Sequence, residues 1–279
     1  MNPRAGLDWN ELWRTAAASH WPDLRNRVQY WDRRAASFAQ RRPGGAYVRA
    51  VLEHLAPEPH WSVLDVGCGT GTLAIPLAGR VREVTAVDFS AAMLAHLAHD
   101  RDRCGIRNLR TVHAGWEDDW ARAGIGVHDL AIASRSLVVD DLAAALGKLD
   151  RSARRKVLIV APAGGGPVDR GVLAAIGRPA QPGPDYIYVY NLLHQSGIYA
   201  HVRVLDLGED LSFPSPEEAL GFFRGFIERL QPLEEERLAA HLDKHLAPRA
   251  GRWVLEDAQP CRWALIWWEK GPGGEDARP

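Results

Sequence analysis

The segment that most limits how this chain can fold spans residues 63–72. A short apolar run, Val-Leu-Asp-Val, leads into three alternating glycines, and an apolar stretch typical of a helix follows them. Glycine is required where the backbone takes a positive φ or where a ligand must approach with no Cβ in its way. We therefore expect a buried strand, a tight turn and a helix whose first N–H groups point toward the turn. For this segment alone, a strand-to-helix turn without a ligand remains the alternative.

A second segment, residues 83–88, has the pattern of another buried strand and ends in the carboxylate of Asp88. An acid roughly 20 residues after a glycine turn can accept hydrogen bonds from the two hydroxyls of a ribose. Ser90 is better placed than Asp88 to cap the helix that follows. Together, the glycine turn and Asp88 favour a cofactor that carries adenosine.

These motifs also carry a family resemblance. Asp-Val-Gly-Cys-Gly-Thr-Gly at residues 65–71, with Val-Asp-Phe-Ser at 87–90 and Met-Leu at 93–94, resembles the class I S-adenosylmethionine-dependent methyltransferases, and within them the small-molecule branch. The resemblance is specific over about residues 61–160. It implies S-adenosylmethionine as the cofactor and S-adenosylhomocysteine as the product. A dinucleotide-binding turn usually has a glycine where this chain has Thr72, so a nicotinamide-dependent oxidoreductase is a distant alternative.

The resemblance implies roles for individual residues around this cofactor. Asp65 and the glycine turn would lie against the methionine part, Asp88 would hold the ribose hydroxyls, and Phe89 would flank the adenine. The expected cofactor-binding residues of these two strand ends are Asp65, Gly67, Cys68, Gly69, Thr70, Asp88, Phe89 and Met93.

The residues expected beside the adenine depart from the usual pattern of the family. Many relatives carry an acid after the third strand that accepts from the adenine amino group, but this chain has Gly115 there. We therefore expect Trp116 to stack on the adenine and Glu117 to accept a hydrogen bond. A surface acidic turn that caps a helix is an equal alternative for this segment.

The residues after the fourth strand face the transferred methyl group in this family. Ser134 is expected on the cofactor side and Arg135 on the acceptor side. An arginine here can pair with an anionic substrate or with a cofactor carboxylate, or it can be tied to a helix C-terminus. The Asn/Asp-Pro-Pro-aromatic motif of enzymes that methylate base amines is absent, which counts against that acceptor class. The expected substrate-contacting residues are Tyr30, Arg135, Tyr190 and His194.

No catalytic residue can be assigned from the sequence. Displacement at a sulfonium needs mainly alignment and exclusion of water, and a base is required only if the acceptor must lose a proton. The sequence does not choose among the histidines that qualify, which are His113, His128, His194 and His201.

The composition and net charge limit the classes of partner and cofactor that we expect for this chain. The chain has 279 residues, a formal net charge of −1 and a hydrophobic content of 46%, so no nucleic-acid footprint is expected. Three widely separated cysteines, Cys68, Cys104 and Cys261, lack metal spacing and indicate a reducing cytoplasm, with neither a disulfide nor a metal. No membrane-spanning run or signal peptide is expected. The expected partner is a small-molecule methyl acceptor, and the expected state is a monomer or a homodimer.

The regular alternation of strands and helices predicts an α/β protein, a doubly wound Rossmann-like fold with a seven-stranded, mostly parallel sheet. We expect an N-terminal helical lid over residues 1–60, a cofactor-binding domain over 61–270 with a helical insertion at about 208–250, and a disordered tail at 271–279. The expected strands are 63–66, 84–88, 109–113, 129–133, 156–160, 198–207 and 261–269. The expected helices are 24–40, 46–55, 72–80, 91–103, 142–149, 184–197, 215–230 and 233–246, with a further helical face at 7–13.

Three functions remain open from the sequence. The favoured one is methyl transfer to a small molecule by in-line displacement. The second is methyl transfer to a macromolecule, either RNA or protein, and the third is a non-catalytic regulatory module that binds S-adenosylmethionine. The glycine turn and Asp88 argue for binding of the cofactor rather than for turnover.

Overall fold

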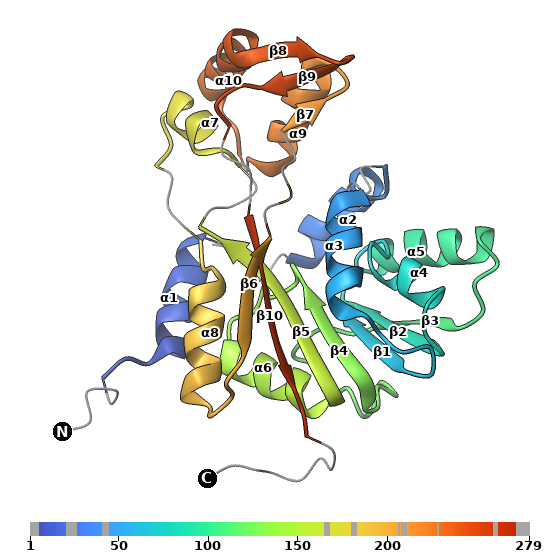
Figure 1. Cartoon of the computed structure of the whole chain (residues 1–279). Helices are drawn as coiled ribbons and strands as arrows, with labels where there is room; N and C mark the ends of the chain where they lie inside the picture. Colours follow the sequence, from blue (N-terminus) through green and yellow to red (C-terminus); the bar gives the residue numbers. More distant parts are fainter. Residues whose placement is uncertain are drawn as a thin grey trace.

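The computed structural model describes residues 6–20, 27–40, 45–164, 168–179, 183–205, 207, 211–227, 229–258 and 262–271. At its centre is a seven-stranded sheet in the order β3-β2-β1-β4-β5-β10-β6 (Figure 1). β10 runs antiparallel to β5 and β6, and the other neighbouring strands are parallel. The strands are β1 (Ser62–Val66), β2 (Glu83–Asp88), β3 (Leu109–His113), β4 (His128–Ser134), β5 (Ala153–Ala163), β6 (His201–Leu205) and β10 (Arg262–Glu269).

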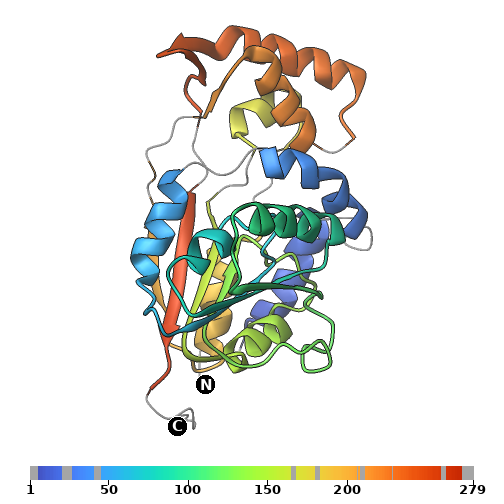
Figure 2. The same cartoon turned by 90° about the vertical axis from the view of Figure 1, so that its right-hand side faces the viewer.

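Helices cover both faces of this sheet because its central strands are apolar on both sides. All of β1 is buried, and β4 is buried up to its last residue, as is typical of parallel strands between two helical layers. One face carries α3 (Gly45–Leu55), α4 (Ala74–Ala78) and α5 (Ala91–Arg103). The other face carries α1 (Trp9–His20), α6 (Leu142–Arg151) and α8 (Tyr186–Gln195). The two layers are seen on either side of the sheet in Figure 2.

The parallel strands end together at one edge of the sheet, which we call the carboxyl edge; the opposite edge is the amino edge. The loops after β1, β2, β3 and β4 meet at the carboxyl edge, where ligands bind in open α/β sheets. α2 (Arg27–Gln40) packs against α5 near this edge. The N-terminal segment thus contributes helices both to the sheet faces and to the edge where the predicted site lies.

A small lobe stands above the carboxyl edge in Figures 1 and 2. We define it as α7 (Arg170–Ala175), α9 (Pro216–Phe226), α10 (Pro232–His245) and a three-stranded sheet in the order β7-β9-β8. It has a separate apolar core, to which Val172, Phe223 and Leu238 each contribute a fully buried side chain. The three strands are β7 (Ser212–Phe213), β8 (Leu246–Arg249) and β9 (Arg252–Leu255).

The sequence predicted the elements of the main sheet well and those of the small lobe only in part. Residues 91–103 and 109–113 match α5 and β3 residue for residue. The helix expected over 72–80 is shorter, because turns continue up to Leu73 before α4 begins. The strand expected over 198–207 is also shorter, and β5 is longer than expected at both ends. The sequence patterns did not predict α7, β7, β8 or β9.

Local geometry explains one of these omissions. β8 and β9 are joined by Ala250 and Gly251, with φ values of 47° and 77°. A two-residue hairpin turn of this kind needs a positive φ at both central residues, which favours Asn-Gly or Gly-Gly. Ala-Gly is an uncommon sequence for such a turn, so the sequence did not predict this hairpin. Pro248 fits because β8 is an edge strand of the small sheet.

Three further expectations concern absences or terminal residues. None of the helices in the described part of the chain is long and apolar enough to cross a membrane. Within that part, no group of three or more His, Cys, Asp or Glu side chains could hold a metal ion, and Cys68 and Cys104 are free thiols. Cys261 and residues 272–279 lie outside the described residues.

Candidate active site

The glycine turn after β1 forms as predicted, and its three glycines have different reasons to lack a side chain. The φ values are 69° at Gly67, 55° at Gly69 and 89° at Gly71. A Cβ on Gly67 would lie 2.2 Å from Cβ of Ser136, and one on Gly71 would lie 2.4 Å from Cδ1 of Leu97. A Cβ on Gly69 would meet nothing within 4 Å. Packing therefore requires two of the glycines, whereas Gly69 borders open space where a ligand can approach the backbone.

Asp88 connects this turn to the end of β2. One carboxylate oxygen accepts from the Gly69 amide at 2.8 Å, and the other accepts from the Ser90 amide at 2.8 Å. Burial raises the pKa of Asp88, although these two amide hydrogen bonds oppose the shift. A carboxylate offers about four acceptor positions, so Asp88 keeps capacity for further donors. Ser90 is the N-cap of α5, as predicted, and its side chain accepts from the Met93 amide.

Asp65 is the second buried acid at the carboxyl edge. It is the last residue but one of β1 and is only 2% exposed. Burial and, to a smaller extent, the nearby Asp88 carboxylate raise the pKa of Asp65 to about 7, although a hydrogen bond from the Ala74 amide opposes the shift. Asp65 and Asp88 therefore place two acids at the ends of neighbouring strands, where a cationic ligand would stabilise their ionised forms.

The remaining residues predicted around the turn are buried. Cys68 and Thr70 are each 6% exposed and Met93 is 3% exposed. Burial raises the pKa of the Cys68 thiol well above its ordinary value, and the Asp88 and Asp65 carboxylates raise it further. The thiol therefore stays protonated at neutral pH and is a poor nucleophile.

On the adenine side, α2 reaches the two loops that follow β2 and β3. Arg27 of α2 forms an ion pair with Glu117, and its guanidinium carbon lies 5.4 Å from the centre of the Phe89 ring. Trp116 is largely buried; its Nε1 donates to the Ser136 carbonyl at 3.1 Å. Glu117 is thus engaged by α2, and Trp116 packs in the core beneath the loop. Their contacts with adenine stay predictions.

The end of β4 brings together a cluster that the sequence predicted only in part. The Ser134 hydroxyl lies 2.6 Å from the hydroxyl of Tyr47, a buried residue of α3. The guanidinium carbon of Arg135 lies 4.4 Å from the centre of the Tyr47 ring and 5.3 Å from that of Trp263. Arg135 has a φ of 56°, in the left-handed region that few non-glycine residues adopt. Such local strain at a strand end is common in functional sites.

Comparison with known proteins agrees with this geometry. Residues 63–156 match the family model described as a methyltransferase domain. A protein of Haemophilus influenzae, described as uncharacterized, is 34% identical over 241 residues, which are 85% of this chain and 88% of that protein. The chain belongs to the class I S-adenosylmethionine-dependent methyltransferases. Its cofactor is S-adenosylmethionine, and it is an enzyme of this class.

Two other similar proteins differ in their acceptors. A 23S rRNA (uracil(1939)-C(5))-methyltransferase of Pseudomonas fluorescens is 37% identical over 109 residues, but these are only 35% of this chain and 24% of that enzyme. A phosphoethanolamine N-methyltransferase structure from Haemonchus contortus, in complex with phosphomonomethylethanolamine and S-adenosylhomocysteine, has a TM-score of 0.57 at 17% identity. The match covers 90% of this chain and 60% of the phosphoethanolamine N-methyltransferase chain. At this identity the structure shows the shared fold alone.

The side chains of this methyltransferase fit its cofactor on their own chemistry. Asp88 keeps acceptor capacity for the ribose diol, and Gly69 leaves the backbone open beside it. Asp65 is a buried acid near the same turn, which suits a cofactor with a cationic methionine part. The fit rests on these three residues.

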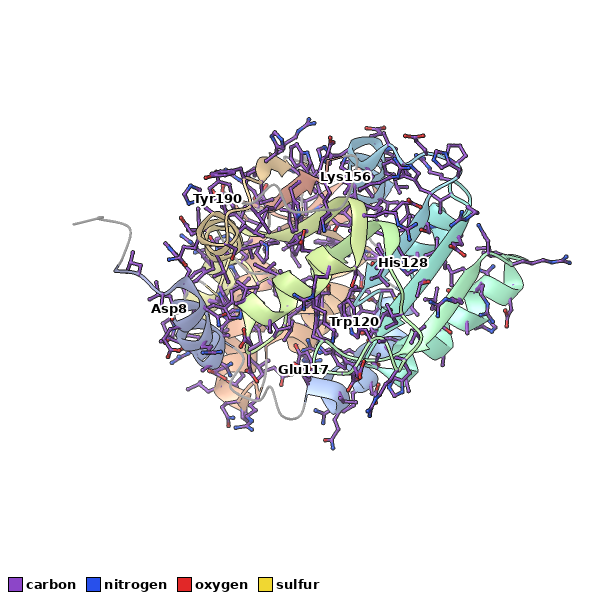
Figure 3. All side chains as sticks on the ribbon, turned by 90° about the horizontal axis from the view of Figure 1, so that it is seen from below. Asp8, Glu117, Trp120, His128, Lys156 and Tyr190 are labelled. Atoms are coloured by element: carbon purple, nitrogen blue, oxygen red, sulfur yellow. The ribbon has the colours of Figure 1, made fainter. Side chains whose placement is uncertain are left out.

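Two of the predicted substrate residues lie away from the others. Tyr190 and His194 belong to α8, and the ring of His194 packs 5.5 Å from that of Tyr199, just before β6 begins. Because β6 runs parallel to β5, this position is toward the amino edge. Figure 3 shows Tyr190 well apart from Glu117. The structure does not bring Tyr190 or His194 together with the predicted cofactor residues, so a role for either in acceptor binding stays an untested prediction.

Tyr30 lies on α2, where its half-buried ring is covered by Arg34. The guanidinium carbon of Arg34 lies 3.7 Å from the centre of the Tyr30 ring and 5.5 Å from that of Phe226 on α9. Tyr30 therefore stands where α2 meets the small lobe. This place is compatible with the predicted contact to the acceptor.

Sequence reasoning missed three residues that the fold brings to the site. Asp32 of α2 accepts from the Ser90 hydroxyl beside Asp88, Arg27 pairs with Glu117, and Tyr47 bonds to Ser134. All three lie in the segment before β1. The predicted lid over residues 1–60 includes all three, but neither the family resemblance nor helix periodicity shows which loop each side chain will contact.

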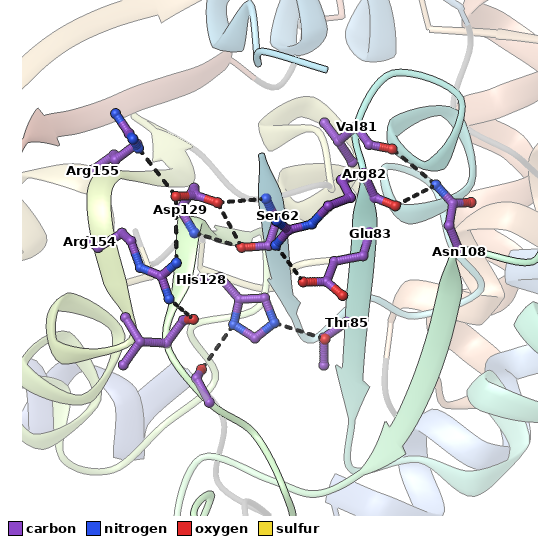
Figure 4. Close-up of polar contacts among 12 residues, drawn as sticks. Ser62, Val81, Arg82, Glu83, Thr85, Asn108, His128, Asp129, Arg154 and Arg155 are labelled. Carbon is purple, nitrogen blue, oxygen red and sulfur yellow. Dashed lines mark hydrogen bonds and ion pairs between the residues drawn. The ribbon is translucent and has the colours of Figure 1, made fainter. Parts of the chain in front are cut away.

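The histidines considered as bases have other partners in the fold. His128 begins β4 at the amino edge, where its ring nitrogens bond to the Gly126 carbonyl and the Thr85 hydroxyl (Figure 4). The His113 ring bonds to the Phe89 carbonyl at 2.9 Å, and His201 stacks on Trp267. His128 lies at the wrong edge of the sheet to act as a base in methyl transfer.

Proposed function

We propose that this methyltransferase transfers its methyl group to a small molecule that binds between the end of β4, α2 and the small lobe. The observation that carries the proposal is the cover over the carboxyl edge. α2 and the small lobe both lie there, and Arg34 contacts Tyr30 of α2 and Phe226 of α9. A site covered by a helix and a lobe suits a compact acceptor better than a long polymer.

The side chains near this cover are suited to an organic molecule with an apolar part. Trp31 lies 5.3 Å from both Tyr30 and Phe38, centre to centre, along α2. Phe222 and Phe226 lie 4.8 Å apart on α9. These rings are half-buried, so they retain surface that a ligand can cover. The net charge of −1 gives no general attraction to nucleic acid.

The chemistry requires alignment more than acid–base catalysis. S-adenosylmethionine supplies an activated methyl group on a sulfonium. Asp88 and the glycine turn would hold its adenosine and methionine parts, and the small lobe and α2 would exclude water from the acceptor. Burial raises the pKa of Tyr47, an effect that the Arg135 cation and the hydrogen bond with Ser134 only partly offset. Tyr47 is therefore a neutral hydroxyl that can orient the acceptor rather than a base.

We also propose that α2 acts as the lid of the cofactor site. Arg27 joins it to the loop after β3, and Asp32 joins it to the start of α5 beside Asp88. Both contacts involve loops expected to hold the adenosine. Release of the cofactor would then require at least the Arg27 contact to open.

A transfer assay with methyl-labelled S-adenosylmethionine tests the proposed acceptor class. The purified full chain is incubated in parallel with the small-molecule fraction, the total RNA and the soluble protein of its source cells. We expect label only in the small-molecule fraction. Label confined to RNA or protein would establish a macromolecular acceptor, in agreement with the rRNA methyltransferase relative. Cofactor binding with no label in any fraction would favour the regulatory module.

A further inference from the structure

We propose that Arg135 binds an anionic group, either a carboxylate or a phosphate, of the methyl acceptor. This inference rests on the proposed small-molecule function and names the acceptor class that the site selects. Four observations carry it: the position of Arg135, its lack of a carboxylate partner among the described residues, the direction of its side chain, and the rings that hold it.

Arg135 follows β4 directly, at the carboxyl edge of the sheet and next to Ser134. Its amide donates to the Val160 carbonyl at 2.8 Å, which anchors the backbone to β5. The φ of 56° persists because this hydrogen bond and the neighbouring strand fix the chain. The half-buried guanidinium contacts Tyr47 and Trp263, and within the described part of the chain no carboxylate forms an ion pair with it.

The side chain extends from the end of β4 toward β10. β4 lies between β1, which carries the glycine turn, and β5, beyond which lies β10. Arg135 reaches toward Trp263, which pairs with Pro162 at the start of β10. The next residue, Ser136, leans the other way; its hydroxyl donates to the Val66 carbonyl at 2.6 Å, beside Gly67. The Arg135 guanidinium therefore lies on the β10 side of β4, against Tyr47, whose hydroxyl is also close to Asp65.

The two rings hold the guanidinium without neutralising it. Cation–π contacts attract the cation to the ring faces, and the Tyr47 hydroxyl accepts from the guanidinium. The guanidinium has five N–H groups, so others stay suited to bidentate binding of a carboxylate or a phosphate. Tyr47 also offers a neutral hydroxyl, shared with Ser134, next to this fork. The alternative that Arg135 ties down a helix C-terminus has no support, because no helix carbonyl among the described residues accepts from its side chain.

The test separates acceptors by charge before the reaction. The small-molecule fraction of the source cells is divided by ion exchange into anionic, neutral and cationic pools, and each is incubated with the enzyme and methyl-labelled S-adenosylmethionine. We expect label in the anionic pool. Arg135→Asn, which removes the charge and tolerates a positive φ, should lower that label about 10-fold or more, because a hydrogen bond between charged groups is lost. With Arg135→Lys, the label in the anionic pool should lie between that of the wild type and that of Arg135→Asn.

Binding of S-adenosylhomocysteine, measured by calorimetry, shows that the variants fold and separates the two halves of the site. Its affinity should change less than about twofold in Arg135→Asn. The control is Arg80→Asn, a substitution of the same type at an exposed arginine after α4. It should change neither the label in the anionic pool nor the affinity for S-adenosylhomocysteine.

Three results would overturn the inference. They are label only in the neutral or cationic pool, full transfer by Arg135→Asn, and a loss of S-adenosylhomocysteine affinity as large as the loss of transfer. The last result would assign Arg135 to a carboxylate of the cofactor. Label in none of the pools would contradict the proposed function itself, and the inference with it.

Discussion

Two buried carboxylates on neighbouring strands, at opposite edges of the same sheet, are held in opposite ways. Asp129 on β4 lies at the amino edge, where it accepts from the Ser62 amide at 2.8 Å and the Ser62 hydroxyl at 2.9 Å (Figure 4). Arg155 donates to it at 3.2 Å. Burial raises the pKa of Asp129, but these hydrogen bonds outweigh burial and hold the pKa below its ordinary value. Asp65 on β1 faces another acid, Asp88, and has a pKa of about 7.

Within one sheet, an acid that stabilises the fold thus lies at the amino edge and an acid suited to binding a ligand lies at the carboxyl edge. At the amino edge every partner of Asp129 is supplied by the chain, so the ionised carboxylate stabilises the fold. At the carboxyl edge the chain places two acids together and supplies amides but no cation for Asp65 among the described residues. An acid whose charge is uncompensated in the free protein is expected where a cationic ligand binds.

The largest effect is expected at Asp65. Its pKa in the folded protein lies above its ordinary value of 3.8, so its contribution to stability is fully present below that value and is lost as the pH rises to about 7. Asp65→Asn should therefore raise the free energy of unfolding of the free protein at pH 8 by on the order of 3 kcal/mol. Denaturant unfolding at pH 5 and pH 8 measures this, and the gain should be smaller at pH 5.

The same variant should bind S-adenosylmethionine more weakly, because the cationic methionine part loses its counter-charge. A variant that is more stable at pH 8 and binds the cofactor as well as the wild type would remove Asp65 from the site. A variant that is less stable at pH 8 would contradict the proposed origin of the raised pKa.

At the amino edge, Asp129→Ala should lower the free energy of unfolding by about 2–3 kcal/mol at pH 7, because the buried Ser62 groups lose their acceptor. The sign of the pH dependence is the reverse of that at Asp65. A lowered pKa gives stability that is present above the ordinary value and is lost as the pH falls through the folded value. Thermal unfolding at pH 7 and pH 3 tests this. The exposed pair Arg82–Glu83 supplies the control, since Glu83→Ala should change stability by less than about 1 kcal/mol.

Asp88→Ala should weaken cofactor binding by about 1.5–3 kcal/mol, the range for hydrogen bonds to a charged group. Calorimetric titration with S-adenosylhomocysteine gives the affinity directly. Glu83→Ala, at the other end of β2, is the matched control. Equal affinity in Asp88→Ala and the wild type would show that the ribose is held elsewhere.

The smallest effect is expected at the lid. Arg27 has a side chain that is 19% exposed and pairs with a Glu117 side chain that is 54% exposed, so Arg27→Gln should cost less than about 1 kcal/mol of stability. If α2 closes the cofactor site, dissociation of S-adenosylhomocysteine should become several-fold faster in stopped-flow measurements. An unchanged dissociation rate would separate α2 from cofactor release.

The cofactor half could be predicted from the sequence because local rules govern it. Three alternating glycines, an acid at the end of the next strand and a serine cap each have a meaning within a few residues. Gly67, Gly69, Gly71, Asp88 and Ser90 occupy the predicted positions.

The acceptor half depends on contacts between distant segments. Tyr47 meets Ser134 across 87 positions of the chain, and Trp263 of the last strand packs on Arg135. Nothing local to these residues indicates such pairs. For a related reason, the sequence predicted two helices of the small lobe, α9 and α10, but not the lobe as a unit, because its core joins α7 to a segment that begins at residue 211.

Calorimetric titration of the wild-type chain with S-adenosylhomocysteine and, in parallel, with NAD shows which cofactor the carboxyl edge binds. We expect roughly micromolar binding of S-adenosylhomocysteine and no binding of NAD, because the carboxyl edge joins an open Gly69 to Asp88 in a methyltransferase fold. Binding of NAD without S-adenosylhomocysteine would contradict this expectation and assign Asp88 to the ribose of a dinucleotide.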